Sequence, residues 1–304
     1  MNHKTILITG IHGFVGRNLE TIIREKYPSA RIIGIDIAFI KGNKHVVVMN
    51  LFDQNKISHL LEHELPDYIF HLAGSIYTPN FKLLYESNVL TTEILLDSLR
   101  NRGMSCRVII PGSAAEYGAV HVDDLPLDED HQTNPVSPYG VSKVWQTTIA
   151  RYYGQLGVDV VVGRMFNLMG RGMPVGLSLG SFITQLKKIK AGDLPPRLVC
   201  GNLKSKRDFI DIHDACLGLI AIAERGACGE IYNICSGESI SIGNLLDQMI
   251  RLINMNVPIE SEEKLYKSID IENIFGNNHK IFQETGWLPR ITLLESCRRM
   301  LEDI

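Results

Sequence analysis

Residues Thr9–Gly16, with the sequence TGIHGFVG, decide the fold class of this 304-residue chain. The short apolar run Lys4–Thr9 precedes this glycine-rich stretch, and an amphipathic stripe through Leu19, Ile22 and Ile23 follows it. Strand, glycine-rich turn and helix in this order form a diphosphate-binding unit, because glycine admits the ligand close to the backbone and the helix N-terminus is partly positive. We therefore predict that this stretch binds the diphosphate of a dinucleotide.

Each glycine of this stretch has its own predicted role. Gly10 permits a tight turn, Gly13 lets backbone amides approach the diphosphate, and Gly16 lets the helix pack closely on the sheet. The residues between these glycines are expected to line the cofactor without acting as catalysts, namely His12, Phe14 and Val15.

Apolar runs and amphipathic stretches alternate through the first half of the chain. This alternation is typical of a parallel sheet with helices on both faces, so we predict an α/β fold, a doubly wound Rossmann sheet. After the first strand, the predicted strands are 31–36, 45–49, 68–72, 107–110 and 158–162, and the predicted long helices are 88–102 and 139–156.

The alternation of apolar runs and amphipathic stretches becomes less regular after residue 164. Residues 170–180 are rich in glycine and show no periodic pattern. Helices are expected at 182–190, 212–224, 242–253 and 293–302, with a short strand at 230–234. No flexible linker separates the two halves, so we expect a smaller C-terminal lobe interleaved with the first. The predicted division assigns 1–166 with about 208–236 to dinucleotide binding, and 167–207 with 237–304 to the substrate.

Composition and charge narrow the functional classes. Apolar residues make up 45% of the chain and charged residues 21%, which indicates a folded protein with a large core. The net charge of −3 does not favour nucleic acid or an anionic membrane as partner. No apolar run reaches the ~20 residues that span a bilayer. The six cysteines have no metal-binding or paired spacing, so we expect reduced thiols, no metal and a cytoplasmic location.

An acidic side chain ends the second predicted strand. Asp36 at this position can accept hydrogen bonds from both ribose hydroxyls and would repel a 2′-phosphate, which favours NAD(H) and leaves NADP(H) open. Asp53 either contacts the adenine amino group or caps a helix. The other residues expected to line the cofactor are Asn50, Leu51, Leu72, Ala73, Gly74, Asn88, Tyr139, Lys143 and Met165.

Tyr139 and Lys143 lie one helical turn apart in the sequence YGVSK, so a helix places them on one face. A free phenol has a pKa of roughly 10, and a nearby ammonium lowers it into the range where the phenol transfers protons. Lys143 can also donate hydrogen bonds to the nicotinamide ribose. After a dinucleotide loop and the fifth strand, this pair predicts acid-base catalysis.

Ser113 follows the fifth predicted strand in the sequence PGSAAEYG. Ligands of doubly wound sheets sit at the carboxyl ends of the strands, where this hydroxyl could orient a substrate carbonyl. The alternative is a serine that caps a helix. Ser113 is not predicted to be an acylated nucleophile, because no G-x-S-x-G sequence surrounds it.

Together these residues resemble the extended short-chain dehydrogenase/reductase family. The resemblance covers nearly the whole chain and includes the glycine-rich stretch, Asp36, Ser113, Tyr139 and Lys143. Further matching segments are His71–Gly74, Asn88 at the predicted start of a helix, Arg164–Asn167 with Met165 in place of the usual proline, and Lys206–Asp211. It implies a homodimer built from the helices that contain Asn88 and Tyr139.

Members of this family act mostly on nucleoside-diphosphate sugars, and the second half is most similar to the GDP-6-deoxy-D-mannose reductases. The resemblance implies that Asn167 and Arg207 contact the diphosphate or its neighbouring sugar, unless Arg207 pairs with Asp208 or Asp211. Lys267 stands where many relatives have an arginine near the diphosphate. The implied substrate-binding residues are Ser113, Ala114, Glu116, Asn167, Arg207 and Lys267.

Ala114 and Ala115 replace the acid-base pair that dehydratases of the family carry after the catalytic Thr or Ser, which argues against 4,6-dehydration. The first hypothesis is therefore an NAD(P)H-dependent 4-ketoreductase of a nucleoside-diphosphate-4-keto-6-deoxy-hexose. The alternative is an NAD-dependent 4-epimerase of a nucleoside-diphosphate sugar, in which the same residues act. A dinucleotide-binding sensor is a third hypothesis, although it would not need the serine, tyrosine and lysine set.

Overall fold

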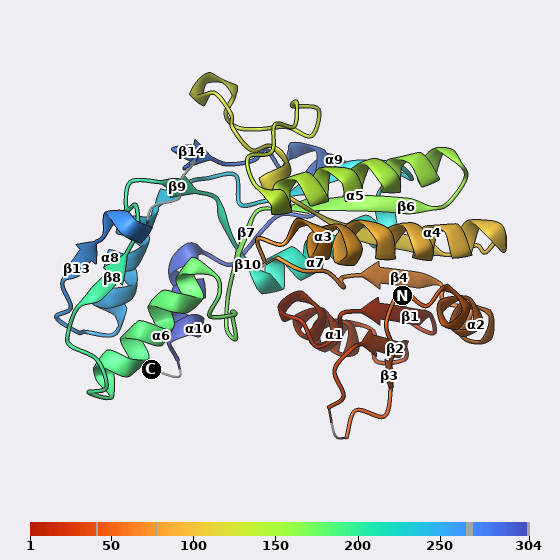
Figure 1. Cartoon of the computed structure of the whole chain (residues 1–304), viewed down its shortest axis with the longest axis horizontal. Helices are drawn as coiled ribbons and strands as arrows, with labels where there is room; N and C mark the ends of the chain where they lie inside the picture. Colours follow the sequence, from red (N-terminus) through yellow and green to blue (C-terminus); the bar gives the residue numbers. More distant parts are fainter. Residues whose placement is uncertain (41, 77, 266–269, 303–304) are drawn as a thin grey trace.

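The computed structural model describes residues 1–40, 42–76, 78–265 and 270–302 (Figure 1). Its centre is a seven-stranded sheet in the order β11-β6-β5-β4-β1-β2-β3. All neighbouring strands are parallel, and the order extends in both directions from β1, which is the doubly wound arrangement. The α/β Rossmann fold predicted from the sequence is confirmed. The strands are β1 (Thr5–Thr9), β2 (Arg31–Asp36), β3 (Val46–Val48), β4 (Tyr68–His71), β5 (Arg107–Ser113), β6 (Val160–Met165) and β11 (Ile231–Ile234).

Helices cover both faces of this sheet because its strands carry apolar side chains in both directions. Ile6 and Ile8 of β1 contact one core, whereas Leu7 between them contacts the other. The first core is closed by α1 (Phe14–Lys26), α7 (Ile212–Arg225) and α9 (His279–Thr285), and the second by α2 (Gln54–Glu64), α4 (Thr91–Asn101) and α5 (Pro138–Gln155).

Three further helices form a separate core at one end of the molecule, away from the large sheet (Figure 1). Leu245, Leu246 and Met249 recur at helical spacing and are fully buried in this core. The predicted division of the chain into two lobes stays a prediction. The elements are α6 (Ser178–Lys190), α8 (Ile242–Leu252), α10 (Leu293–Leu301) and the strands β7 (Asn167–Met169), β8 (Leu198–Cys200), β9 (Lys206–Arg207), β10 (Phe209–Asp211), β12 (Ile240–Ser241), β13 (Ile259–Ser261) and β14 (Asn273–Ile274).

The helix predicted to begin at Asn88 begins seven residues earlier, so that prediction is wrong. Asn80 caps the start, its side chain accepting a hydrogen bond from the Leu83 amide. Helix α3 (Phe81–Leu84) continues through a π-helical turn, η1 (Tyr85–Leu90), into α4. Asn88 therefore lies inside a continuous helical segment. A π turn is set by tertiary contacts and leaves no periodicity that a sequence pattern could show.

The carboxyl ends of the strands meet at one edge of the sheet. In the parallel register Thr9 of β1 lies opposite His71 of β4, and Ser113 of β5 lies opposite Met165 of β6. Strand β5 was predicted to stop three residues short of Ser113, and β6 three residues short of Met165. Both candidate residues are therefore the last residues of neighbouring strands. In the described part of the chain, no helix has the length and apolarity needed to cross a membrane.

Candidate active site

The glycine-rich stretch packs tightly against the end of β4. Gly10 has a positive φ of 65°, and a Cβ built on it would lie 2.8 Å from the Ala73 backbone. A Cβ on Gly16 would lie 2.3 Å from the carbonyl oxygen of Gly10. Gly10 thus adopts a turn conformation that favours glycine, and Gly16 packs closely on the loop, so a side chain at either position would displace the loop.

The first turn of α1 offers backbone amides to an anion and contains no negative side chain. Gly13 is its N-cap residue and supplies no side-chain acceptor, and the turn contains no acidic residue. The first amide groups of a helix have no partner within the helix, and they favour an anion. This donor set fits a dinucleotide diphosphate, with Phe14 and Val15 supplying helix amides and His12 on the loop before them.

Asp36 lies beside this loop at the carboxyl end of β2. Its Oδ2 atom accepts a hydrogen bond of 3.0 Å from the His12 amide, and its Oδ1 atom accepts one of 3.1 Å from the Ala38 amide. The His12 ring lies 3.8 Å from the same carboxylate and contacts Asn43. These two bonds fix the carboxylate beside the glycine-rich loop, and its contact with a ribose stays a prediction.

The segment after β3 contains Asn50, Leu51 and Asp53, and the cofactor contacts of Asn50 and Leu51 stay predictions. The Asn50 side chain is bonded to the Phe52 amide, and Leu51 is buried in the core. Asp53 caps α2 by accepting a hydrogen bond of 3.1 Å from the Lys56 amide. Of the two roles considered for Asp53, the structure shows the helix cap.

Asn88 joins the end of β4 to helix α5. Its amide accepts a hydrogen bond from the Ser75 amide and donates to the Ser75 carbonyl and to the Ser142 hydroxyl, at 2.8, 3.0 and 3.0 Å. A Cβ on Gly74 would lie 2.6 Å from the Asn88 side chain. Asn88 thereby holds the segment Leu72–Gly74 in place beside α5.

His71, at the end of β4, is fully buried. Its Nδ1 lies 3.0 Å from the Thr9 hydroxyl and its Nε2 lies 3.1 Å from the Thr92 hydroxyl. Burial, with a contribution from the Lys143 charge, lowers the pKa of His71 from 6.5 to about 3. The ring is therefore neutral at physiological pH.

Acidification is expected to destabilise the chain through His71. Because the folded pKa lies below the unfolded value, the unfolded state binds the extra proton between pH 6.5 and pH 3, and stability falls as the pH falls through this window. At pH 5 the loss should be roughly 2 kcal/mol of the free energy of unfolding. Urea denaturation at pH 7 and pH 5 measures it. The difference in the free energy of unfolding between pH 7 and pH 5 should shrink in His71→Asn and persist in His59→Gln. An equal difference in both variants would contradict the assignment to His71.

Tyr139 and Lys143 occupy the start of α5, one turn apart as predicted. Ser137 caps this helix by accepting a hydrogen bond of 3.0 Å from the Gly140 amide. A Cβ on Gly140 would lie 2.5 Å from the Ala115 carbonyl oxygen, so the helix start packs directly on the segment that follows Ser113. The tertiary structure therefore brings the predicted tyrosine and serine segments together.

The Lys143 ammonium is buried and anchored. Its Nζ donates to the carbonyl oxygen of Pro111 in β5 and to the Gln146 side chain. An ammonium has three hydrogens, so one more donor remains for a ligand. Burial lowers the pKa of Lys143 to about 8, and the negative charge of Glu116 opposes this shift.

Ser113 ends β5 and begins a short 3-10 turn, η2 (Ala114–Glu116). Its Oγ accepts a hydrogen bond of 3.2 Å from the Ala115 amide, and its own amide donates one of 2.7 Å to Glu116. The capping role considered for Ser113 is thus present. The hydrogen of the hydroxyl is not used in that bond and stays available to a substrate oxygen. Ala114 is buried beside it.

Sequence reasoning missed a buried ion pair behind Ser113. Glu116, predicted to bind substrate, is fully buried and accepts hydrogen bonds from the Arg164 guanidinium at 3.0 and 3.2 Å. Arg164 also lies 4.5 Å over the ring of Tyr117. Glu116 belongs to the PGSAAEYG segment and Arg164 begins the segment Arg164–Asn167, but no sequence spacing relates the two. The β5–β6 register brings them together, because Gly112, four residues before Glu116, lies opposite Arg164.

Asn167 and Arg207 lie on strands of the second half. The Asn167 side chain donates a hydrogen bond of 2.9 Å to the carbonyl oxygen of Asp208, the residue after Arg207. Arg207 pairs with Asp270 at 2.9 Å, which is neither of the two partners considered from the sequence. Burial lowers the pKa of Arg207. Lys267 lies outside the described residues.

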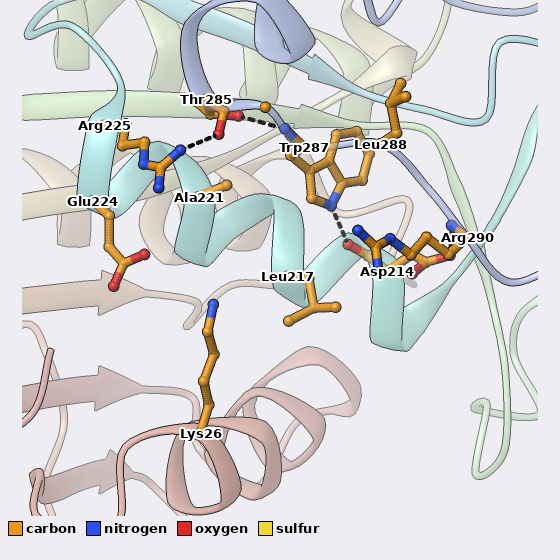
Figure 2. A pocket seen from close by; sticks show the side chains of 11 residues that line it. Lys26, Asp214, Leu217, Ala221, Glu224, Arg225, Thr285, Trp287, Leu288 and Arg290 are labelled. Atoms are coloured by element: carbon orange, nitrogen blue, oxygen red, sulfur yellow. Dashed lines mark hydrogen bonds between the residues drawn. The ribbon is translucent and has the colours of Figure 1, made fainter.

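A hollow of about 230 Å³ lies between α1, α7 and the segment after α9 (Figure 2). The Trp287 ring nitrogen donates a hydrogen bond of 3.1 Å to the Asp214 carbonyl oxygen, which holds that segment on α7. None of the predicted catalytic or cofactor residues lines it. Within the described ranges, no group of three potential metal ligands occurs.

Comparison with known proteins agrees with this geometry. The model of the NAD dependent epimerase/dehydratase family matches residues 6–235. The chain is 28% identical to GDP-6-deoxy-D-mannose reductase of Pseudomonas aeruginosa, over 99% of this chain and 97% of that protein. It is also 28% identical to GDP-6-deoxy-D-talose 4-dehydrogenase of Aggregatibacter actinomycetemcomitans, over 98% and 96%.

A solved structure is similar over the same length. RMD from Pseudomonas aeruginosa, complexed with NADPH, has a TM-score of 0.88 and 27% identity, covering 99% of this chain and 98% of that one. The glycine-rich stretch, the sheet order and the family match all indicate the same assignment. The chain belongs to the NAD dependent epimerase/dehydratase family.

Proposed function

We propose that the chain is an NAD(P)H-dependent 4-ketoreductase of a nucleoside-diphosphate-4-keto-6-deoxy-hexose, similar to GDP-6-deoxy-D-mannose reductase. One observation carries this proposal. Helix α5 places Tyr139 and Lys143 at the carboxyl edge of the sheet and packs through Gly140 on the segment of Ser113. The two named relatives, which span the whole chain, support a 6-deoxyhexose substrate.

The residues of the site have complementary tasks. The nicotinamide dinucleotide, when bound, supplies the hydride. Tyr139 gives its phenolic proton to the oxygen of the substrate ketone, and the Ser113 hydroxyl orients that oxygen by donating a hydrogen bond. Lys143 favours the phenolate left on Tyr139 because its ammonium is anchored one turn away.

The substrate's diphosphate requires cationic and amide donors, for which we propose Arg207 and Asn167. Arg207 would exchange part of its pairing with Asp270 for the diphosphate. Ala114 and Ala115 offer no group that could move the protons of a 4,6-dehydration, which supports reduction over dehydration.

The direct test is incubation with NADH or NADPH and a panel of 4-keto-6-deoxy sugar nucleotides that includes the GDP-mannose derivative. We expect loss of the reduced-nicotinamide absorbance and a 6-deoxyhexose product identified by mass spectrometry and NMR. No loss of absorbance with any 4-keto sugar would contradict the proposal. Tightly held NAD released on denaturation, without net cofactor turnover, would indicate the 4-epimerase instead.

Asp36 is proposed to favour NADH over NADPH. Its carboxylate accepts a hydrogen bond from the His12 amide of the glycine-rich loop. A carboxylate at the end of the second strand would repel the 2′-phosphate of NADPH. In Asp36→Ser the kcat/KM for NADPH should rise at least ~10-fold relative to that for NADH, because like-charge contacts cost more than about 1.4 kcal/mol. Steady-state kinetics with both cofactors measures the ratio. Asp123→Ser, at an exposed position, is the control, and an unchanged ratio in Asp36→Ser would contradict the role.

We also propose a homodimer, formed through an exposed aromatic surface on α3, η1 and α5. The ring of Trp145, 41% exposed, makes edge contacts with Phe81 at 5.4 Å and Tyr85 at 6.0 Å. Exposed aromatic side chains that contact one another on a surface are typical of an interface. Trp145→Asp should convert a dimer into a monomer in light scattering, whereas Val122→Asp, at an exposed site elsewhere, should not. A monomeric wild-type chain would overturn this proposal.

A further inference from the structure

A buried chain of hydrogen bonds runs from the end of β1 to Lys143, and the mechanism above does not use it. The chain passes from Thr9 to His71 at 3.0 Å, from His71 to Thr92 at 3.1 Å and from Thr92 to Gln146 at 2.8 Å. Gln146 then accepts from the Lys143 ammonium. All five side chains are buried, and Gln146 is 1% exposed.

The direction of each bond follows from the hydrogens available. The Thr92 hydroxyl has one hydrogen and donates it to the Asn88 carbonyl at 2.8 Å, because a carbonyl can only accept. Thr92 Oγ1 must therefore accept from Gln146 Nε2 and from His71 Nε2. This assigns the proton of neutral His71 to Nε2, so its Nδ1 accepts from the Thr9 hydroxyl, which itself accepts from the Ala73 amide.

The same reasoning fixes the orientation of the Gln146 amide. Its Nε2 is committed to Thr92, so its Oε1 faces Lys143, three residues away on the same helix. With the Pro111 carbonyl, Gln146 takes two of the three ammonium hydrogens. The third hydrogen is then left for a ligand.

The charges around Lys143 make this acceptor important. The Glu116 charge acts on it from η2, His71 lies near it on β4, and Tyr139 lies one turn before it on the same helix. His71 is neutral and Glu116 is already paired with Arg164. An oxygen acceptor beside a buried ammonium stabilises its charged form, and without it the neutral amine is favoured.

We propose that Gln146 is a positioning residue that keeps the Lys143 ammonium charged and aimed at the cofactor, its own amide being oriented by the chain Thr9–His71–Thr92. This inference rests on the proposed function only in requiring that Lys143 contact a bound nicotinamide dinucleotide. Gln146 lies outside the serine, tyrosine and lysine set, and it would act on the proton donor Tyr139 through Lys143.

The experiment measures NADH binding to the full chain by the fluorescence of the bound cofactor, from pH 7 to pH 10, without any sugar. The affinity should fall as Lys143 loses its proton. In Gln146→Leu the midpoint of this fall should move about one pH unit lower, since an acceptor is lost. In Gln146→Glu the midpoint should move higher, since an anion replaces the amide. Gln155→Leu, at the exposed end of α5, should match the wild type.

Opposite shifts in the two Gln146 variants distinguish the positioning role from a merely structural one, which would move both in the same direction. Equal midpoints in all variants, shifts of one sign, or no NADH binding by the wild-type chain would overturn the inference. The proposed function fails separately if 4-keto sugars are not reduced although NADH binds with shifted midpoints.

Discussion

Tyr139→Phe is expected to slow the reduction of a 4-keto sugar nucleotide by about 100-fold or more in kcat, with little change in NADH affinity. The variant loses the hydroxyl that gives its proton to the substrate oxygen, and general acid catalysis contributes roughly 10²–10⁴-fold to a rate. The aromatic ring remains, so the packing at the start of α5 is preserved. Initial rates of cofactor oxidation measure the loss, and NADH fluorescence measures the binding.

Tyr152→Phe is the matched control for this variant. Tyr152 lies on the same helix and is 56% exposed, away from the Ser113 segment. Its loss of a hydroxyl should leave kcat within about twofold, as for surface substitutions in general. If Tyr139→Phe kept the wild-type turnover rate, the proton would come from another group, and the assignment of the acid would be wrong.

Glu116→Ala is expected to destabilise the chain by about 3–5 kcal/mol, because it leaves the Arg164 charge buried without its partner. The side chains of Glu116 and Arg164 are 0% and 3% exposed, so water cannot replace the lost carboxylate. The Ser113 amide also loses its acceptor, which loosens the residue that orients the substrate. Urea denaturation measures the change in the free energy of unfolding.

Two further variants test the physical cause. Glu260→Ala removes one partner of an exposed pair, Arg197–Glu260, with side chains 53% and 46% exposed, and should cost less than about 1 kcal/mol. Replacing Glu116 and Arg164 together by Leu and Met should recover much of the lost stability, since no unpaired charge remains. Equal effects of Glu116→Ala and Glu260→Ala would refute the buried-pair explanation.

Local patterns explain why some of the site could be predicted without a structure. Gly10, Gly13 and Gly16 lie within seven consecutive residues, in the loop after β1 and the first turn of α1. Tyr139 and Lys143 lie on one helix face, so sequence spacing alone relates the residues of each group. The strand before the loop and the helix after it supplied the context that made the glycine pattern informative. Asn88 shows the limit, since a π turn inside a longer helix cannot be inferred from apolar periodicity.

The amino-acid sequence by itself indicated the doubly wound sheet through its alternation of strand and helix patterns. It indicated the glycine-rich loop and the Tyr139–Lys143 pair because each depends on residues that are near neighbours along the chain. Only the tertiary structure decided that Glu116 pairs with Arg164, that Arg207 pairs with Asp270, and that Gln146 reaches Lys143 from a buried chain of side chains. Such contacts depend on strand register and on how α4 and α5 pack, which no local spacing specifies.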